Sequence, residues 1–113
     1  MEAGAYVALK SDAIYDMASF HAESRRALGF PESYRGDMDA WAECLASVRA
    51  PAGERMMAAH VEPGEMLQLE IPDLAELQER APDVVEALVA AVAAVNQHCL
   101  ATGQAPAVAL ILS

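Results

Sequence analysis

The sequence of 113 residues contains few aromatic and few basic side chains, and each shortage narrows the range of folds and partners. Aromatic residues make up 5% of the chain while alanine is abundant, which favours helices packed through small side chains over an aromatic-rich β-sandwich. Seven basic residues stand against 17 acidic ones, giving a formal net charge of −10. This charge disfavours nucleic acid and anionic membranes as partners, because both would be repelled. It favours a basic partner or simple solubility.

Several common sequence motifs are also missing. Cys44 and Cys99 lack the C-x-x-C spacing of a redox or zinc motif, so we expect two buried free thiols. The chain has no glycine-rich phosphate loop and no internal repeat. Its first ten residues lack the basic start and apolar run of a signal peptide, which predicts a cytoplasmic protein. The longest apolar stretch, 84–95, contains Glu86 and is too short to span a bilayer.

Three short runs rich in strand-forming or apolar residues predict strands: AYVAL (5–9), MLQLEI (66–71) and AVALIL (107–112). The last run is apolar throughout, so we expect it to be buried on both faces of a sheet. Helical segments separate the runs, and parallel strands need such long connections. The sequence therefore predicts one α/β domain over residues 1–113, with a small three-stranded parallel sheet packed with about four helices.

Signals for helix ends place helices over about residues 17–28, 38–48, 73–80 and 82–102. We expect Asp16 and Asp37 to cap the first two, because a side-chain carboxylate accepts hydrogen bonds from the free N–H groups at a helix start. Gly29 is expected to end the first helix. In the last helix one stripe is assigned to the core: Val85, Leu88, Val89, Val92, Val95 and Cys99.

The stretch RGDMDAWAEC gathers three carboxylates, one tryptophan and one cysteine. Helical periodicity turns Trp41 toward the core, together with other apolar residues of this helix. It sends Asp39 and Glu43 outward, flanked by Ala42 and Ala46. Small alanines leave such a face open to close approach, so it could dock flat against another protein.

Other roles remain open for these carboxylates. Capping is the favoured interpretation for Asp37, and on composition alone Asp39 and Glu43 are most simply solvated surface charges. A metal site lacks the spacing of an EF-hand loop, and no histidine follows nearby. Catalysis would need a desolvated carboxyl group with a nucleophile in reach, and the sequence indicates neither. We therefore expect no enzyme activity, no metal and no cofactor.

The stretch FHAESRRALGFPESYRGDMDAWAECL (20–45) resembles the barstar family of intracellular ribonuclease inhibitors, above all in FPESY followed by GDMDAW. The C-terminal AVALILS is also similar to the last strand of that family. The resemblance implies a barstar-like fold and the inhibition of a basic ribonuclease or ribonuclease-like toxin domain, as an immunity or antitoxin protein. An acidic helix would imitate the charge of RNA phosphates and block the active site.

The resemblance also implies which residues bind the partner. In the family an aspartate in the first turn of the second helix enters the nuclease active site at a phosphate position, and the matching residue is Asp39. By the same matching, Tyr34, Met38 and Glu43 fall on an aromatic, an apolar and a second acidic contact. The implied partner-binding residues are Tyr34, Asp37, Met38, Asp39, Ala42 and Glu43.

Departures from the family pattern change the expected partner. The characteristic YYG becomes SYRG, so basic Arg35 enters an acidic surface. Tryptophan appears one position early as Trp41, which leaves Ala42 on the contact face. Acidic contacts of the family's last helix fall near His98 and Thr102, and the middle loop is longer. We therefore expect a partner other than the nuclease bound by the best-known member. The alternative function is a protein-interaction module that regulates a non-nuclease partner.

Overall fold

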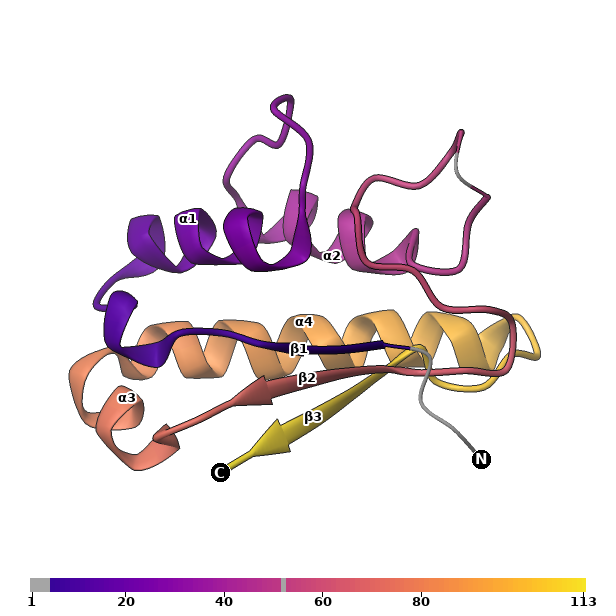
Figure 1. Cartoon of the computed structure of the whole chain (residues 1–113). Coiled ribbons are helices and arrows are strands. Elements are labelled where there is room, and N and C mark those ends of the chain that lie inside the picture. Colours follow the sequence, from indigo (N-terminus) through magenta and orange to yellow (C-terminus); the bar gives the residue numbers. More distant parts are fainter. Residues whose placement is uncertain (1–4, 52) are drawn as a thin grey trace.

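The computed structural model describes residues 5–51 and 53–113, and in this part of the chain three parallel strands form one sheet. The elements in chain order are β1 (Ala5–Ala8), the 3-10 helix η1 (Ser11–Ala13), α1 (Met17–Leu28), α2 (Met38–Ala46), β2 (Leu67–Ile71), α3 (Leu74–Arg80), α4 (Pro82–Ala101) and β3 (Val108–Leu112). Figure 1 shows α1 and α2 in one row above α4, with the sheet beside them. The predicted α/β fold, with a three-stranded parallel sheet and four α-helices, is confirmed.

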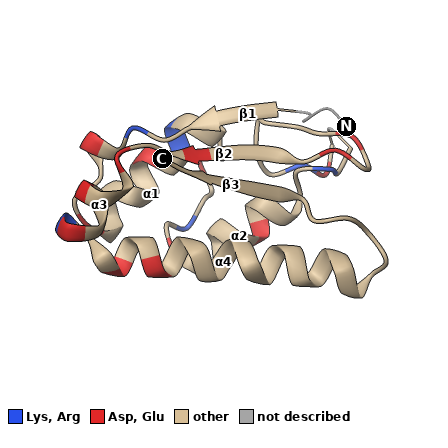
Figure 2. Ribbon diagram, turned by 90° about the horizontal axis from the view of Figure 1, so that it is seen from below, with Lys and Arg blue, Asp and Glu red and all other residues tan. Residues whose placement is uncertain are grey.

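The central strand of the sheet is β2, because the strands lie in the order β1-β2-β3. Its Leu67, Leu69 and Ile71 are fully buried, while Gln68 and Glu70 on the opposite face are partly exposed. Figure 2 shows the sheet along one side of the molecule and α4 along the other. The core therefore lies between one face of the sheet and the helices.

The edge position of β3 overturns one expectation from the sequence. Val108 is buried, but the following residues are only partly so, and Leu112 is 47% exposed. The prediction that this apolar run is buried on both faces was wrong. An apolar run does not reveal that its strand lies at the sheet edge, nor that helices cover only one face.

Local capping explains where α1 begins and ends. Asp16 accepts the N–H of Ser19 through Oδ1 at 2.8 Å, and the Ser19 hydroxyl accepts the Asp16 N–H at 3.0 Å, a reciprocal capping box. Gly29 ends the helix with a φ of 71°, and a Cβ there would lie 2.3 Å from the Cβ of Ala58. Only glycine suits this position, so the predicted cap and end of α1 are confirmed.

One stripe of α4 is buried: Val84, Val85, Leu88, Val92, Val95 and Cys99. Val89 was wrongly assigned to this stripe and is 40% exposed, because it lies about 90° around the helix from the middle of the stripe.

By length and composition alone, α4 could cross a membrane, although the shorter apolar run 84–95 within it was expected to be too short. The core helix of a folded domain has the same character, and α4 packs against α2, α3 and β3. Both cysteines, Cys44 and Cys99, are free and buried as predicted.

Candidate functional site

The start of α2 is fixed by Asp37, the predicted N-cap. Its Oδ1 accepts the backbone N–H of Ala40 at 2.7 Å, so capping is confirmed. This hydrogen bond, helped by the nearby guanidinium of Arg35, holds the pKa of Asp37 below its usual range. The carboxylate of Asp37 is therefore already engaged by its own helix before any partner arrives.

The inner side of α2 fixes the rotation of the helix. Trp41 is completely buried, its indole N–H donates to the Ser24 hydroxyl at 3.0 Å, and its ring lies 5.5 Å from that of Phe20. Cys44 and Leu45 are buried beside it. The predicted inward orientation of Trp41 is confirmed, and with this side packed the opposite side must face away from the core.

The outer side of α2 carries the predicted carboxylates. Asp39 and Glu43 are exposed, Ala46 is exposed, and Ala42 is half-buried. Asp39 lies in the first turn, and its side chain makes no hydrogen bond or ion pair with another described residue. A carboxylate there is stabilised by the positive end of the helix dipole and remains available to an outside cation.

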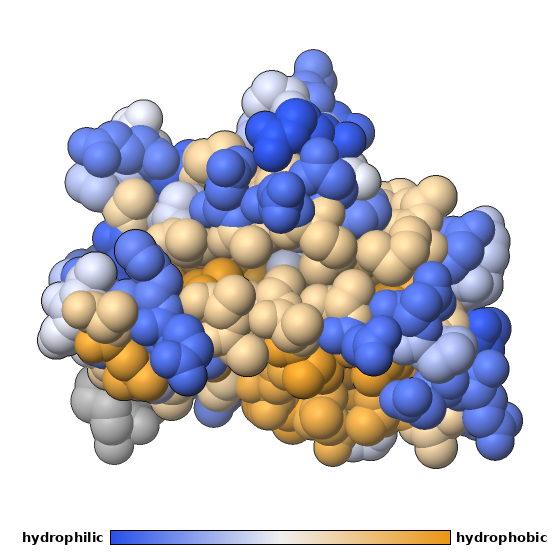
Figure 3. All heavy atoms as spheres, turned by 180° about the vertical axis from the view of Figure 1, so that it is seen from behind, coloured by the Kyte–Doolittle hydropathy of each residue, from blue (hydrophilic) through white to orange (hydrophobic). Residues whose placement is uncertain are grey.

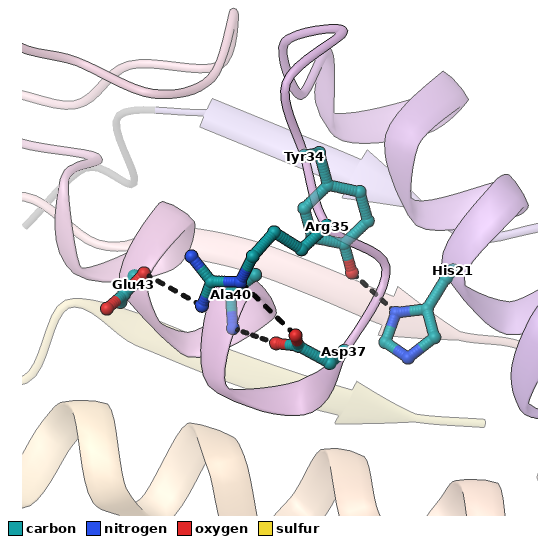
Figure 4. A network of polar contacts seen from close by, with 6 residues as sticks. All are labelled: His21, Tyr34, Arg35, Asp37, Ala40 and Glu43. Atoms are coloured by element: carbon teal, nitrogen blue, oxygen red, sulfur yellow. Dashed lines mark hydrogen bonds and ion pairs between the residues drawn. The ribbon is translucent and has the colours of Figure 1, made fainter.

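Asp37, Asp39 and Glu43 form the acidic surface at the start of α2. Arg35 links two of its carboxylates, those of Asp37 and Glu43 (Figure 4). Its Nε lies 3.3 Å from Oδ2 of Asp37, and its Nη2 lies 3.6 Å from Oε1 of Glu43. These acids, Asp37 first, then Glu43 and more weakly Asp39, raise the pKa of the Arg35 guanidinium above its usual value. The sequence placed Arg35 in the acidic surface, and the structure adds that it pairs with two of the acids.

Tyr34 and Met38 face partly inward. The Tyr34 hydroxyl is hydrogen-bonded to Nδ1 of His21 at 2.5 Å (Figure 4). The Tyr34 ring also packs against Phe30, with 4.8 Å between the ring centroids. Burial raises the pKa of Tyr34 and lowers the pKa of His21. Met38 is half-buried against the core. Both residues adjoin the acidic surface, but much of each side chain is already committed to the fold.

An apolar groove borders the acidic surface. It is shallow, about 220 Å³, and is lined by Ala42, Glu43, Ala46, Ala94, Val95 and His98. Figure 3 shows the rear of the molecule, where a broad hydrophobic area is bordered by hydrophilic residues. His98 of α4 and Glu43 of α2 both line this groove, and His98 stands where the family resemblance would have provided an acidic contact.

The sequence did not predict two contacts at this site: the hydrogen bond between Tyr34 and His21, and the ion pairs of Arg35 with Asp37 and Glu43. No sequence motif predicts either contact, because both contacts depend on the path of the loop before α2. Among residues 5–51 and 53–113, no group of three or more His, Cys, Asp or Glu side chains is placed to hold a metal ion. The arrangement suits recognition of a cationic group by an exposed carboxylate.

Comparison with known families agrees with this geometry. The model of the family described as Barstar (barnase inhibitor) matches residues 5–111. The match includes all four α-helices and almost the whole sheet. A search of curated proteins found no match.

Proposed function

The chain belongs to the barstar family and is barnase-inhibitor-like, and from this premise we propose that it inhibits a cognate basic ribonuclease or ribonuclease-like toxin domain. The outer side of α2 would enter the active site of that enzyme, with Asp39 at a position otherwise taken by an RNA phosphate. The observation that carries the proposal is the exposed Asp39 carboxylate, which is held at the start of a well-packed helix and has no ion pair with any residue that the structure describes.

Charge supports this mode of inhibition. A ribonuclease binds phosphate through arginine, lysine and histidine side chains, and a carboxylate forms strong charge-assisted hydrogen bonds with the same groups. The net charge of −10 would steer the chain toward a basic enzyme from a distance. Trp41 keeps α2 in one orientation, so Asp39 meets the partner without first having to be ordered.

The biological role follows from the same proposal. An inhibitor that must protect the cell producing a ribonuclease would act in the cytoplasm, as an immunity or antitoxin protein. Members of the barstar family are inhibitors rather than enzymes, and we assign no catalytic role to the carboxylates of α2. Asp37, Met38, Tyr34, Ala42 and Glu43 would surround Asp39 in the interface.

The test is an affinity capture from lysate and culture medium of the source organism. Bait would be the wild type, Asp39→Ala, and Glu79→Ala as a control that removes an exposed acid from α3. We expect wild type and Glu79→Ala to capture a ribonuclease whose RNA cleavage they abolish at a one-to-one ratio, and Asp39→Ala to capture much less. Captured proteins without ribonuclease activity, or equal inhibition by Asp39→Ala, would contradict the proposal.

A second candidate is a protein-interaction module that regulates a non-nuclease partner. It is favoured by His98, which lies where a further acidic contact was expected, beside an apolar groove. The same capture distinguishes the two functions. A partner that lacks ribonuclease activity but still requires Asp39 would support the regulatory module and exclude the inhibitor.

A further inference from the structure

We propose that Arg35 determines the specificity of the acidic surface by holding Asp37 and Glu43 in internal ion pairs, so that Asp39 alone is offered to the partner. The inference rests on the proposed function, in which this surface meets a basic protein. It identifies the preferred partner by its chemistry: a site with one dominant cationic group that meets Asp39, rather than a row of cations.

The loop before α2 places Arg35 where it can reach both acids. Tyr34 is anchored on the inner side by His21 and Phe30, and its backbone N–H donates to the carbonyl of Pro31 at 3.0 Å. Gly36 has a φ of 78°, a conformation that other residues adopt only with strain, and it turns the chain sharply into the helix. Between these two residues Arg35 extends over the first turns of α2, as Figure 4 shows.

The bridge changes the charge that a partner meets. Without Arg35 the surface would present three carboxylates, from Asp37, Asp39 and Glu43. With it, two of them are paired at 3.3 and 3.6 Å, and Asp39 is the one without an ion pair among the described residues. A partner that covers this surface can leave Arg35 paired to its own acids, so the guanidinium is not stranded in the interface.

The ion pairs are exposed, so their effect should appear in binding rather than in folding. The three side chains are 58%, 52% and 58% exposed for Arg35, Asp37 and Glu43. Surface pairs of this kind contribute little to stability. A docked partner excludes water, however, and the interaction energy between charges then increases because the effective dielectric constant falls. Arg35 can therefore be replaced without unfolding the protein, which makes the inference testable.

The experiment uses a fluorescein-labelled hexa-arginine peptide as a cation-rich probe, with binding followed by fluorescence anisotropy at low salt. Arg25→Ala is the matched control, because Arg25 is exposed and makes no ion pair with a described residue. Both variants change the net charge equally. We expect Arg35→Ala to bind the peptide about fivefold more tightly than Arg25→Ala does, the effect of one added near contact in a high dielectric.

A double-mutant cycle with Glu43→Gln isolates the bridge. In the wild-type background we expect Glu43→Gln to weaken peptide binding by less than about twofold, and in the Arg35→Ala background by about fivefold. Equal losses in the two backgrounds, or equal affinities of Arg35→Ala and Arg25→Ala, would overturn the inference. Thermal melting of each variant should match the wild type.

Failure of this inference is distinguishable from failure of the proposed function. The peptide measurements require no ribonuclease, whereas the capture experiment requires one and depends on Asp39. If a ribonuclease is inhibited through Asp39 but the cycle shows no coupling, Arg35 has no role in specificity while the function stands. If the cycle couples and no ribonuclease is captured, the function fails, and with it the assignment of Arg35 to partner choice.

Discussion

On its inner side α2 buries Trp41, Cys44 and Leu45, whereas on its outer side Asp39 and Glu43 remain exposed. Trp41 is enclosed by aromatic and polar neighbours, while the Asp39 side chain makes no hydrogen bond or ion pair with another described residue. One short helix thus separates stability from recognition by the direction in which each side chain points. Changes on the inner side should unfold the protein, and changes on the outer side should leave it folded without its partner.

The largest effect is expected for Trp41→Ala. Removal of a fully buried aromatic side chain leaves a cavity and should lower the free energy of unfolding by about 3–5 kcal/mol. Urea denaturation followed by circular dichroism measures this loss. A variant that unfolds at the wild-type urea concentration but fails to bind would contradict this prediction. It would show that Trp41 belongs to the outer, partner-binding side of α2.

Asp39→Ala should produce the opposite result, with weaker binding and a stability that barely changes, because only a small helix-dipole interaction is lost. By analogy with charge pairs buried in other interfaces, barstar's among them, we expect a loss of at least about 2 kcal/mol in affinity, mainly through a faster off-rate. Glu43→Ala should cost less, because Glu43 is already paired with Arg35.

Surface-binding kinetics with the captured partner would measure both rates. The wild-type on-rate should fall with added salt as the Debye length shrinks from about 30 Å to about 8 Å. An unchanged off-rate for Asp39→Ala, together with an on-rate that is independent of salt, would leave this carboxylate as a helix-stabilising charge only.

A smaller effect is expected for Ser24→Ala, which tests how the inner side is held. Without the Ser24 hydroxyl, the buried indole N–H of Trp41 loses its acceptor, which should cost about 1–3 kcal/mol of stability. Ser33→Ala is the control, because Ser33 is exposed. Equal unfolding midpoints for the two variants would show that water or a shifted neighbour satisfies the indole.

The smallest effect concerns His21, at the boundary between the two sides. In the folded protein, burial lowers the pKa of His21 below its ordinary value of 6.5, although the negative charge of Asp37 partly opposes this shift. As the pH falls, His21 therefore takes up a proton in the unfolded chain before it does so in the folded protein. The free energy of unfolding should not be reduced by this effect above about pH 6.5 and should decline as the pH falls below that value. The buried Glu23, whose pKa is lowered mainly by its hydrogen bond with Arg26, should add its own loss only at more acidic pH.

Urea denaturation at about pH 7.5 and about pH 5.5 measures the contribution of His21. His21→Gln retains a polar side chain but cannot take up a proton, so its stability should change less between these two values. The same change in wild type and variant would assign the pH dependence to other groups.

Much of the fold could be predicted because its signals are local. Asp16, Gly29 and Asp37 mark helix ends through hydrogen bonds within a few residues, and the periodicity of α2 sufficed to turn Trp41 inward. The burial of β3 could not be predicted in the same way. An apolar run looks the same in a central strand and in an edge strand, and only the strand order distinguishes them.

The candidate site, like the fold, could be predicted from the sequence only in part. The outward positions of Asp39 and Glu43 followed from helical geometry, whereas the engagement of Tyr34 by His21 and the reach of Arg35 to Glu43 did not. Both connections depend on the path of the loop between α1 and α2, which includes the positive φ of Gly36. Side-chain pairs formed across such a loop have no fixed spacing in the sequence.

The pairing of the strands also determines when the surface of α2 becomes usable. Residue 5 pairs with residue 67 and residue 67 with residue 108, so no strand finds its neighbour until long segments have been closed into loops. Helices such as α1 and α2 can form in microseconds from their own caps, but sheets of this topology assemble more slowly. During that interval α2 would lack the packed neighbours that hold its rotation. We therefore expect Asp39 to acquire its orientation late in folding, and a newly made chain to bind only after β1 and β3 have each paired with β2.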